Sequence, residues 1–121
     1  MQDYRKLKVW QRAQDACVRV YRLTAEYPPE ERFGLCAQLR DAGVSVGANI
    51  SEGSKRSSNA DKARLWNIAQ SSAAEVMSEL DVAIRLAYPG KEEATALADE
   101  YDQISAMIST LTEQVKRNDK R

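Results

Sequence analysis

Polar side chains recur along one face of the segment 35–53, at positions where a helix that packs in a core normally carries apolar residues. Gln38, Ser45 and Glu52 are seven residues apart, and Asn49 lies between the last two. Residues three, four and seven apart share a helix face, so these groups project from one side of a helix. Amides, hydroxyls and carboxylates in such a row can fix helix register or hold a cation.

The polar set extends to neighbouring positions and to a second helical segment. It comprises Gln38, Arg40, Ser45, Asn49, Glu52, Gly53, Ser72 and Glu75. We interpret it first as a buried network that fixes the register of two antiparallel helices, with Arg40 paired to a glutamate within or between subunits. Buried charges need such partners, because desolvation costs on the order of several kcal/mol per ion. On this interpretation Asn49→Leu or Glu52→Ala disturbs folding or assembly.

A second interpretation gives the carboxylates a chemical role. Glu75 and Glu79 are four residues apart on one predicted helix, and Glu52 is a candidate third ligand. Carboxylate-bound Mg²⁺ assists phosphoryl chemistry without histidine, as in all-helical nucleotide pyrophosphatases. The doubled Glu-x-x-Glu with a matching Glu-x-x-Asp is missing, so a magnesium-dependent nucleotide hydrolase is the weakest alternative. We expect no catalytic residue, no metal site and no cofactor.

The residue types exclude several other reactions. The chain has no histidine, which rules out Ser-His and Cys-His nucleophile pairs and the Glu-x-x-His ligands of di-iron bundles. Its two cysteines, Cys17 and Cys36, lack the spacing of a redox or zinc motif. We therefore expect both to be small core residues in a reducing compartment.

Basic residues cluster near the beginning of the chain and after residue 53. The net charge is zero, but residues 1–64 carry 12 Lys/Arg against 8 Asp/Glu, and residues 65–121 carry 6 against 10. Such halves can simply complement each other in a bundle, whereas a basic patch can bind phosphate. The candidate nucleic-acid contacts are Arg5, Lys6, Lys8, Arg12, Lys55 and Arg56.

Apolar residues at three- and four-residue spacing predict four helices, at about residues 4–26, 30–51, 60–88 and 92–116. Asp3 is the expected cap of the first helix, and the second is expected to stop at Gly53. Ser58 or Asn59 caps the third helix. We expect Trp66 to be partly exposed or to lie at a contact between subunits.

Four amphipathic helices with short connections predict an all-α fold, an antiparallel up-down-up-down four-helix bundle in a single domain of residues 1–121. No apolar run approaches the roughly 18 residues of a membrane span, and the first residues lack the apolar core of a secretion signal. We therefore expect a cytoplasmic protein without membrane contact.

Several motifs resemble the signature of the 23S rRNA intervening-sequence proteins. The principal one is Gln38-x-Arg40-x-Ala42-x-x-Ser45-x-x-x-Asn49-Ile50-x-Glu52-Gly53. It is flanked, in the same order as in that family, by Leu7-x-Val9-Trp10-Gln11-x-Ala13, Pro28, Phe33-Gly34-Leu35 and Ile68-Ala69-x-Ser71-Ser72-x-x-Glu75. Three positions depart from the pattern: Asp41 replaces a usual arginine, Gly47 a common proline and Ser71 a usual glycine.

The resemblance implies a bacterial four-helix bundle that associates with itself into a homopentamer. It also implies a link to ribosomal RNA, and more distantly it extends to the accessory protein of diversity-generating retroelements, a basic pentameric bundle that binds nucleic acid. Asp41 and the zero net charge weaken the transfer of nucleic-acid binding. The expected function is a non-enzymatic ring-like homo-oligomer with RNA as a candidate partner, and the alternative is a scaffold for an unidentified protein.

Overall fold

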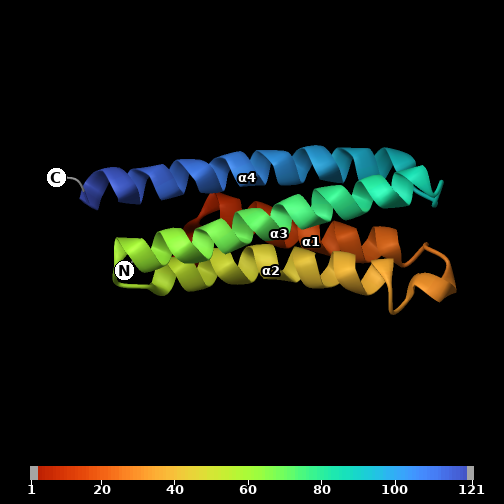
Figure 1. Ribbon diagram of the computed structural model, residues 1–121, viewed down its shortest axis with the longest axis horizontal. Helices are drawn as coiled ribbons and strands as arrows, with labels where there is room; N and C mark the ends of the chain where they lie inside the picture. Colours follow the sequence, from red (N-terminus) through yellow and green to blue (C-terminus); the bar gives the residue numbers. More distant parts are fainter. Residues whose placement is uncertain (1–2, 120–121) are drawn as a thin grey trace.

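The computed structural model describes residues 3–119 and consists of four long helices joined by short connections (Figure 1). The helices are α1 (Lys8–Thr24), α2 (Leu35–Lys55), α3 (Asn59–Arg85) and α4 (Lys91–Asp119). Two short 3₁₀ turns, η1 (Tyr4–Lys6) and η2 (Pro29–Glu31), precede α1 and α2. Residues 3–119 contain no strand. The predicted antiparallel four-helix bundle is confirmed.

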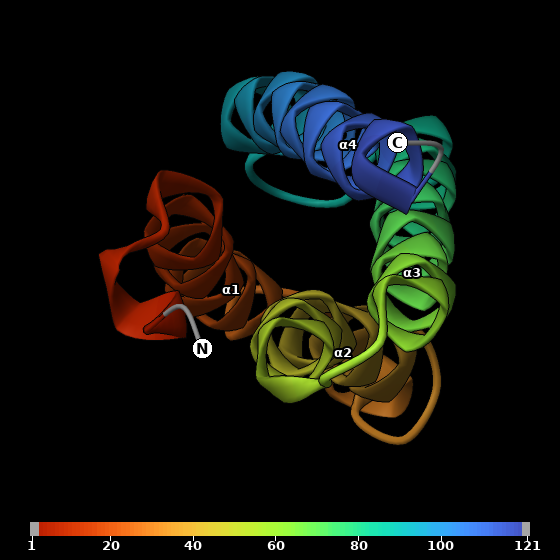
Figure 2. The ribbon, with the colours of Figure 1, turned by 90° about the vertical axis from the view of Figure 1, so that its left-hand side faces the viewer.

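Consecutive helices run in opposite directions, and α1 and α4 close the bundle (Figures 1 and 2). One end of the bundle holds η1, the α2–α3 connection and the C-terminal turn of α4 (Figure 1). The other end holds η2 and the α3–α4 connection.

The interior is filled by the apolar residues that the periodicity predicts. In α2 all five predicted core residues are buried: Leu35, Leu39, Ala42, Val46 and Ile50. In α4, Tyr101 and Ile104 are fully buried, whereas Leu111 is half-buried. Each fully buried large apolar side chain contributes about 1.5–3 kcal/mol relative to exposure, so this core supplies most of the driving force for folding.

Two helices begin later than predicted, because a 3₁₀ turn comes first. Asp3 caps η1 rather than α1, since its carboxylate accepts a hydrogen bond from the backbone N–H of Arg5 at 3.0 Å. Leu7 then has extended backbone, and α1 begins at Lys8. In the same way Glu30 belongs to η2, so α2 begins only after Gly34.

The ends of α2, α3 and α4 also differ from the predicted bounds. Gly53 does not stop α2, which continues to Lys55. The α3 helix ends at Arg85 instead of residue 88, and the chain turns through the left-handed residues Ala87 and Gly90. The α4 helix extends to Asp119, three residues beyond the predicted end. Residues 120 and 121 of the predicted frayed tail lie outside the described residues.

Trp66 is buried, which corrects the expectation of partial exposure. Its exposed fraction is 4%, and its indole N–H donates to the carbonyl of Ile50 at 3.2 Å. A Cβ atom at Gly53 would lie only 2.5 Å from the indole Nε1. The missing side chain at Gly53 therefore creates the space that the indole fills between α2 and α3.

The two cysteines are free thiols with different surroundings. Cys36 is buried and its Sγ donates to the carbonyl of Thr24 at 3.4 Å, whereas Cys17 is half-buried. Burial raises the pKa of both thiols. Because the thiolate is the reactive form, both groups are poor nucleophiles.

Tyr101→Phe is expected to leave the free energy of unfolding unchanged or to raise it by up to about 1 kcal/mol. The Tyr101 hydroxyl is buried without a hydrogen-bond partner among the described residues, and it faces Gly43 beside Cys17. Burial accordingly raises the pKa of Tyr101 well above its ordinary value. Removing this hydroxyl breaks no hydrogen bond, and it removes the free-energy cost of burying a polar group without a partner.

Chemical denaturation measures this effect, and Tyr88→Phe provides the matched control. The Tyr88 hydroxyl donates to Glu31 Oε2, so its removal is expected to lower the free energy of unfolding by about 1 kcal/mol. A loss of more than 1 kcal/mol in Tyr101→Phe would mean that its hydroxyl makes a stabilising contact.

Candidate functional site

Three residues of the predicted polar set form a hydrogen-bonded network between α2 and α3. The hydroxyls of Ser45 and Ser72 lie 2.8 Å apart. The Asn49 side-chain amide donates to the carbonyl of Ser45 at 2.9 Å and to its hydroxyl at 3.0 Å. The two serine side chains are short enough for the helices to approach closely, and their hydrogen bond joins the two helices at one register.

Arg40 has partners other than the glutamate that the sequence suggests. Its Nε donates to the Thr24 hydroxyl at 2.9 Å, and a terminal nitrogen donates to the carbonyl of Tyr21 at 3.2 Å. The guanidinium carbon also lies 4.7 Å from the centre of the Tyr21 ring. Arg40 therefore neutralises the partial negative charge at the C-terminal end of α1, so the prediction of a pair with a glutamate of the same chain is wrong for the described residues.

Glu52 and Gly53 also lie outside the serine–asparagine network. The Glu52 side chain is 61% exposed and pairs with Arg56 at 3.3 Å, so its inclusion in a buried network is wrong. An exposed pair of this kind is worth about 0–1 kcal/mol. Gly53 instead lies against Trp66. The expected damage from Glu52→Ala therefore has no basis in these contacts.

An open groove of about 500 Å³ lies between α2 and α3 on the outer face of the bundle. We call it the α2–α3 groove; its lining residues are Gln38, Asp41, Ala42, Ser45, Ile68, Ser72, Glu75 and Glu79. Sequence spacing placed Glu75 and Glu79 together, but it did not bring in Asp41. The sequence could have indicated Asp41, because it lies four residues before Ser45 on α2 and therefore shares its helix face.

Carboxylates in the α2–α3 groove have no cationic partner within ion-pair distance among the described residues. The ion pairs found there do not include Asp41, Glu75 or Glu79. The Oε1 atom of Glu79 is buried and accepts no hydrogen bond from residues 3–119. Burial, and secondarily the neighbouring Glu75, raise the pKa of Glu79.

The structure does not bring together Glu52, Glu75 and Glu79, the three carboxylates considered as ligands of Mg²⁺. Glu52 lines a different pocket, together with Lys55 and Arg56, and Glu75 and Glu79 line the α2–α3 groove. Within the described chain no three His, Cys, Asp or Glu side chains are placed to hold a metal ion.

Five of the six predicted nucleic-acid contacts lie at one end of the bundle. We call this the basic end; its residues are Arg5 and Lys6 in η1, Lys8 at the start of α1, and Lys55 and Arg56 around the end of α2. The η1 turn packs against α2, and Lys55 Nζ lies 5.2 Å from the centre of the Tyr4 ring. The last turn of α4 adds Lys116 and Arg117 at the same end (Figure 1).

The cations of the basic end are exposed and only loosely paired. Arg5 pairs with Asp3 at 3.1 Å, and hydrogen bonds with Arg5 lower the pKa of Asp3. For Lys6, Lys8 and Lys55 the described residues provide no ion pair. Solvent-exposed pairs are weak, so a phosphate can compete for these groups.

Arg12, the sixth predicted contact, serves as a connection between helices. It donates to both carboxylate oxygens of Glu100, at 2.6 and 2.9 Å, and to Gln103 at 2.7 Å. Arg19 pairs with Glu93 in the same way, and these hydrogen bonds lower the pKa of both glutamates. The two arginines connect α1 to α4, so the structure does not bring Arg12 to the basic end.

A further exposed patch lies across α1 and α2. Val18, Tyr21 and Val44 are between 41% and 49% exposed. Together with Gln14 and Cys17 they line a groove of about 260 Å³. These residues face solvent at adjoining positions, and adjoining exposed apolar side chains mark interaction sites more often than scattered ones do.

These features define an all-helical bundle protein with polar helix contacts, an acidic groove and a basic end. No helix in residues 3–119 is long and apolar enough to span a membrane. The chain belongs to the 23S rRNA-intervening sequence protein family, whose sequence model matches residues 5–110. This confirms the resemblance seen in the signature residues.

Among the solved structures that are similar to this chain, one covers most of both chains. It is the crystal structure of a protein with unknown function from the S23 ribosomal protein family of Bacteroides thetaiotaomicron. The TM-score is 0.77 and the identity 25%, over 86% of this chain and 97% of that one. A comparison with curated proteins found no match. The similarity supports the four-helix fold and leaves the function to be argued from the sites.

Proposed function

We propose that this protein is a non-enzymatic RNA-binding accessory protein that assembles into a ring-like homo-oligomer and acts in the cytoplasm. A pentamer is the form that the family resemblance implies. The single observation that carries the RNA assignment is the convergence of Arg5, Lys6, Lys8, Lys55 and Arg56 at the basic end. Ribosomal RNA is the first candidate, because the chain belongs to the family of 23S rRNA-intervening sequence proteins.

Assembly into a ring strengthens this argument. A ring whose axis is parallel to the helices places the basic end of every copy on the same rim. A phosphate backbone that follows the rim then meets several patches at once, and linked weak contacts raise the overall affinity far above that of one patch. Zero net charge on the chain is compatible with this proposal, because binding depends on the local distribution of charge.

A protein-binding scaffold is the second candidate, and Phe33 is the observation that favours it. Its side chain is 85% exposed, beside η2 at the end of the bundle opposite to the basic end. The Arg32 guanidinium carbon lies 5.0 Å from the centre of this ring. Exposed aromatic residues with a neighbouring arginine are common anchors of protein interfaces.

The test is binding of a labelled 23S rRNA fragment, beside an unrelated structured RNA of equal length, across a salt titration. Wild-type affinity is expected to fall steeply with salt. The triple variant Lys6→Glu, Lys8→Glu and Lys55→Glu is expected to bind at least about tenfold more weakly at low salt, because three phosphate contacts are lost. The slope of log K against log salt is expected to become shallower by about 2 to 3 for each copy in contact.

The matched control applies the same change of charge at the opposite end, with Arg32→Glu, Arg85→Glu and Lys91→Glu. Its affinity is expected to stay much closer to the wild-type value. An affinity that does not vary with salt, or an equal loss in both triple variants, would contradict RNA binding by the basic end. Protein partners that survive nuclease treatment of a native lysate would then favour the scaffold.

A further inference from the structure

We propose that the α2–α3 groove of one copy receives the exposed face of α1 from a second copy, with Arg22 ion-paired to Glu79 and Glu75. This inference rests on the self-assembly part of the proposed function, and it names the contact that builds the ring. The contact is supported by the incomplete groove, the unpartnered face of α1 and the match in height between them.

The groove is incomplete in a single copy. The Oε1 atom of Glu79 is buried with no hydrogen-bond partner in the described chain, although the great majority of buried polar atoms have one. Glu75 and Asp41 line the same groove and add negative charge, so the missing partner is a cation. Ala42 and Ser45, which also line the groove, are small enough to admit a helix from outside.

The exposed face of α1 supplies a complementary cation, Arg22. Asp15, Val18 and Arg22 are all exposed and recur at spacings of three and four, so they share one face. Val18 is 47% exposed. Arg22 has no ion pair among residues 3–119, in contrast to Arg12 and Arg19, which bind α4. Arg22 is thus the arginine of α1 that is free to pair with another chain.

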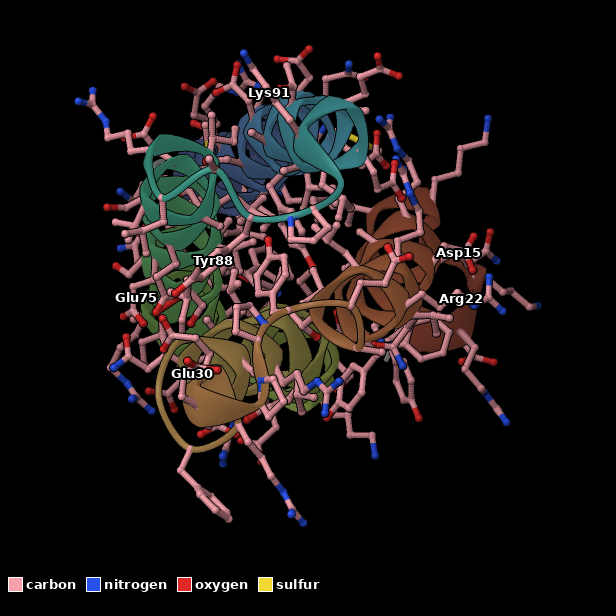
Figure 3. The ribbon with its side chains drawn as sticks, turned by 90° about the vertical axis from the view of Figure 1, so that its right-hand side faces the viewer. Asp15, Arg22, Glu30, Glu75, Tyr88 and Lys91 are labelled. Atoms are coloured by element: carbon pink, nitrogen blue, oxygen red, sulfur yellow. The ribbon has the colours of Figure 1, made fainter. Side chains whose placement is uncertain are left out.

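The face and the groove lie on different sides of the bundle. Viewed along the helices, Asp15 and Arg22 point outward from α1 on one side, and Glu75 points outward from α3 on the opposite side (Figure 3). A contact between two different surfaces is heterologous, so each copy can give one surface and receive the other. Such contacts continue from copy to copy and generate a ring when the rotation closes.

Contacts within one copy fix the relative heights of the helices along the bundle. A Cβ atom at Gly43 would lie 3.4 Å from Cys17 Sγ and 3.9 Å from Cys17 Cα, which places Cys17 of α1 level with Gly43 of α2. The 2.8 Å hydrogen bond between Ser45 and Ser72 sets the register of α2 and α3. Because these two helices are antiparallel, Ala74 of α3 is level with Gly43.

The predicted partners therefore lie at one height. Arg22 is five residues beyond Cys17 on α1, and Glu79 is five residues beyond Ala74 on α3. These two helices run in the same direction (Figure 1), and five residues correspond to about 7.5 Å along each. In a ring whose axis is parallel to the helices, residues in contact have equal heights. Arg22 therefore lies at the height of Glu79 of the neighbouring copy. Val18 lies at the height of Glu75 in the same way.

The test measures native mass by sedimentation velocity, with circular dichroism to establish that each variant is folded. Wild type is expected to be oligomeric, and Arg22→Glu is expected to weaken the association at least about a hundredfold and shift the protein to monomer. Lys91→Glu is the matched control, because Lys91 points away from the bundle at the start of α4 (Figure 3). Its mass is expected to equal that of wild type.

A mixing experiment tests the head-to-tail geometry. The groove variant Glu75→Arg with Glu79→Arg is expected to be monomeric, and mixing it with Arg22→Glu is expected to restore oligomers, because the charges are complementary at both contacts between the two variants. The combined charge swap, with all three substitutions in one chain, is expected to restore oligomers. Glu75→Arg alone replaces the double groove variant if the latter fails to fold, since Glu75 is exposed.

The outcomes separate this inference from the proposed function. An oligomeric Arg22→Glu variant with wild-type mass, or a mixture that stays monomeric, overturns the contact and leaves self-assembly standing. A monomeric wild type overturns self-assembly together with the contact, and RNA binding is judged by its own titration. An Arg22→Glu variant that keeps its mass while a groove variant loses a bound basic protein would assign the groove to a different partner.

Discussion

Trp66→Ala is expected to lower the free energy of unfolding by about 3–5 kcal/mol. The indole is buried between α2 and α3, so its removal leaves a cavity that two long helices cannot collapse to fill. It also leaves the Ile50 carbonyl without the hydrogen bond that the indole N–H donates. Denaturant unfolding followed by circular dichroism measures the loss.

Two substitutions calibrate this result. Trp66→Phe keeps an aromatic ring but loses the N–H donor, so a smaller loss of about 1–2 kcal/mol is expected. Trp10→Ala removes a half-buried indole that packs edge-on against Tyr4 at 5.1 Å, and its loss is expected to be well below that of Trp66→Ala. Equal losses for the two Trp→Ala variants would show that Trp66 does not have the burial described.

Gly53→Ala is expected to lower the free energy of unfolding by about 1–3 kcal/mol, because an added methyl overpacks a rigid contact. Helix propensity alone predicts the opposite sign, since Ala is favoured over Gly by about 1 kcal/mol inside a helix. The contact dominates because the new Cβ would lie 2.5 Å from Nε1 and 2.6 Å from Cδ1 of the Trp66 ring. A shift in tryptophan fluorescence should accompany the loss.

The same change at Gly43 is the control. A Cβ there meets Cys17 Sγ and the Tyr101 hydroxyl at 3.4 Å, close to ordinary contact distance, so Gly43→Ala is expected to stay within about 1 kcal/mol of wild type. In the Trp66→Ala background, Gly53→Ala is expected to become stabilising, since coupled neighbours are not additive. A gain in stability from Gly53→Ala in the wild-type background would contradict the steric argument.

The fold was predictable because it depends on local periodicity. Leu39, Val46 and Ile50 recur at helical spacing and are all fully buried, and the same logic located four helices. Their ends were less predictable, since they depend on turns whose hydrogen bonds involve few residues. Gly53 shows the difficulty: a glycine near the end of a helix usually marks its stop, but here it makes room for a side chain from the next helix.

The candidate sites depended on contacts that sequence spacing does not contain. Lys8 and Arg12 belong to one basic run, and nothing local separates them. Lys8 stays available at the surface, whereas Arg12 is bound by Glu100, which lies 88 residues further along the chain. Likewise Glu75 and Glu79 were paired by their spacing on one helix, whereas Asp41 lies on α2 and comes close to them because α2 packs against α3. Long-range pairing therefore decided which charges remained available at the surface.

The placement of the connections has a practical consequence for labelling. The basic end holds η1, the α2–α3 connection and the last turn of α4, whereas the α3–α4 connection lies at the far end (Figure 1). A fluorophore or affinity group attached near Asp3 or Asp119 would therefore sit beside the proposed RNA surface. A short insertion between Tyr88 and Gly90, in an exposed turn, would point the probe the other way. Immobilisation through that turn would leave the cationic rim facing the solution.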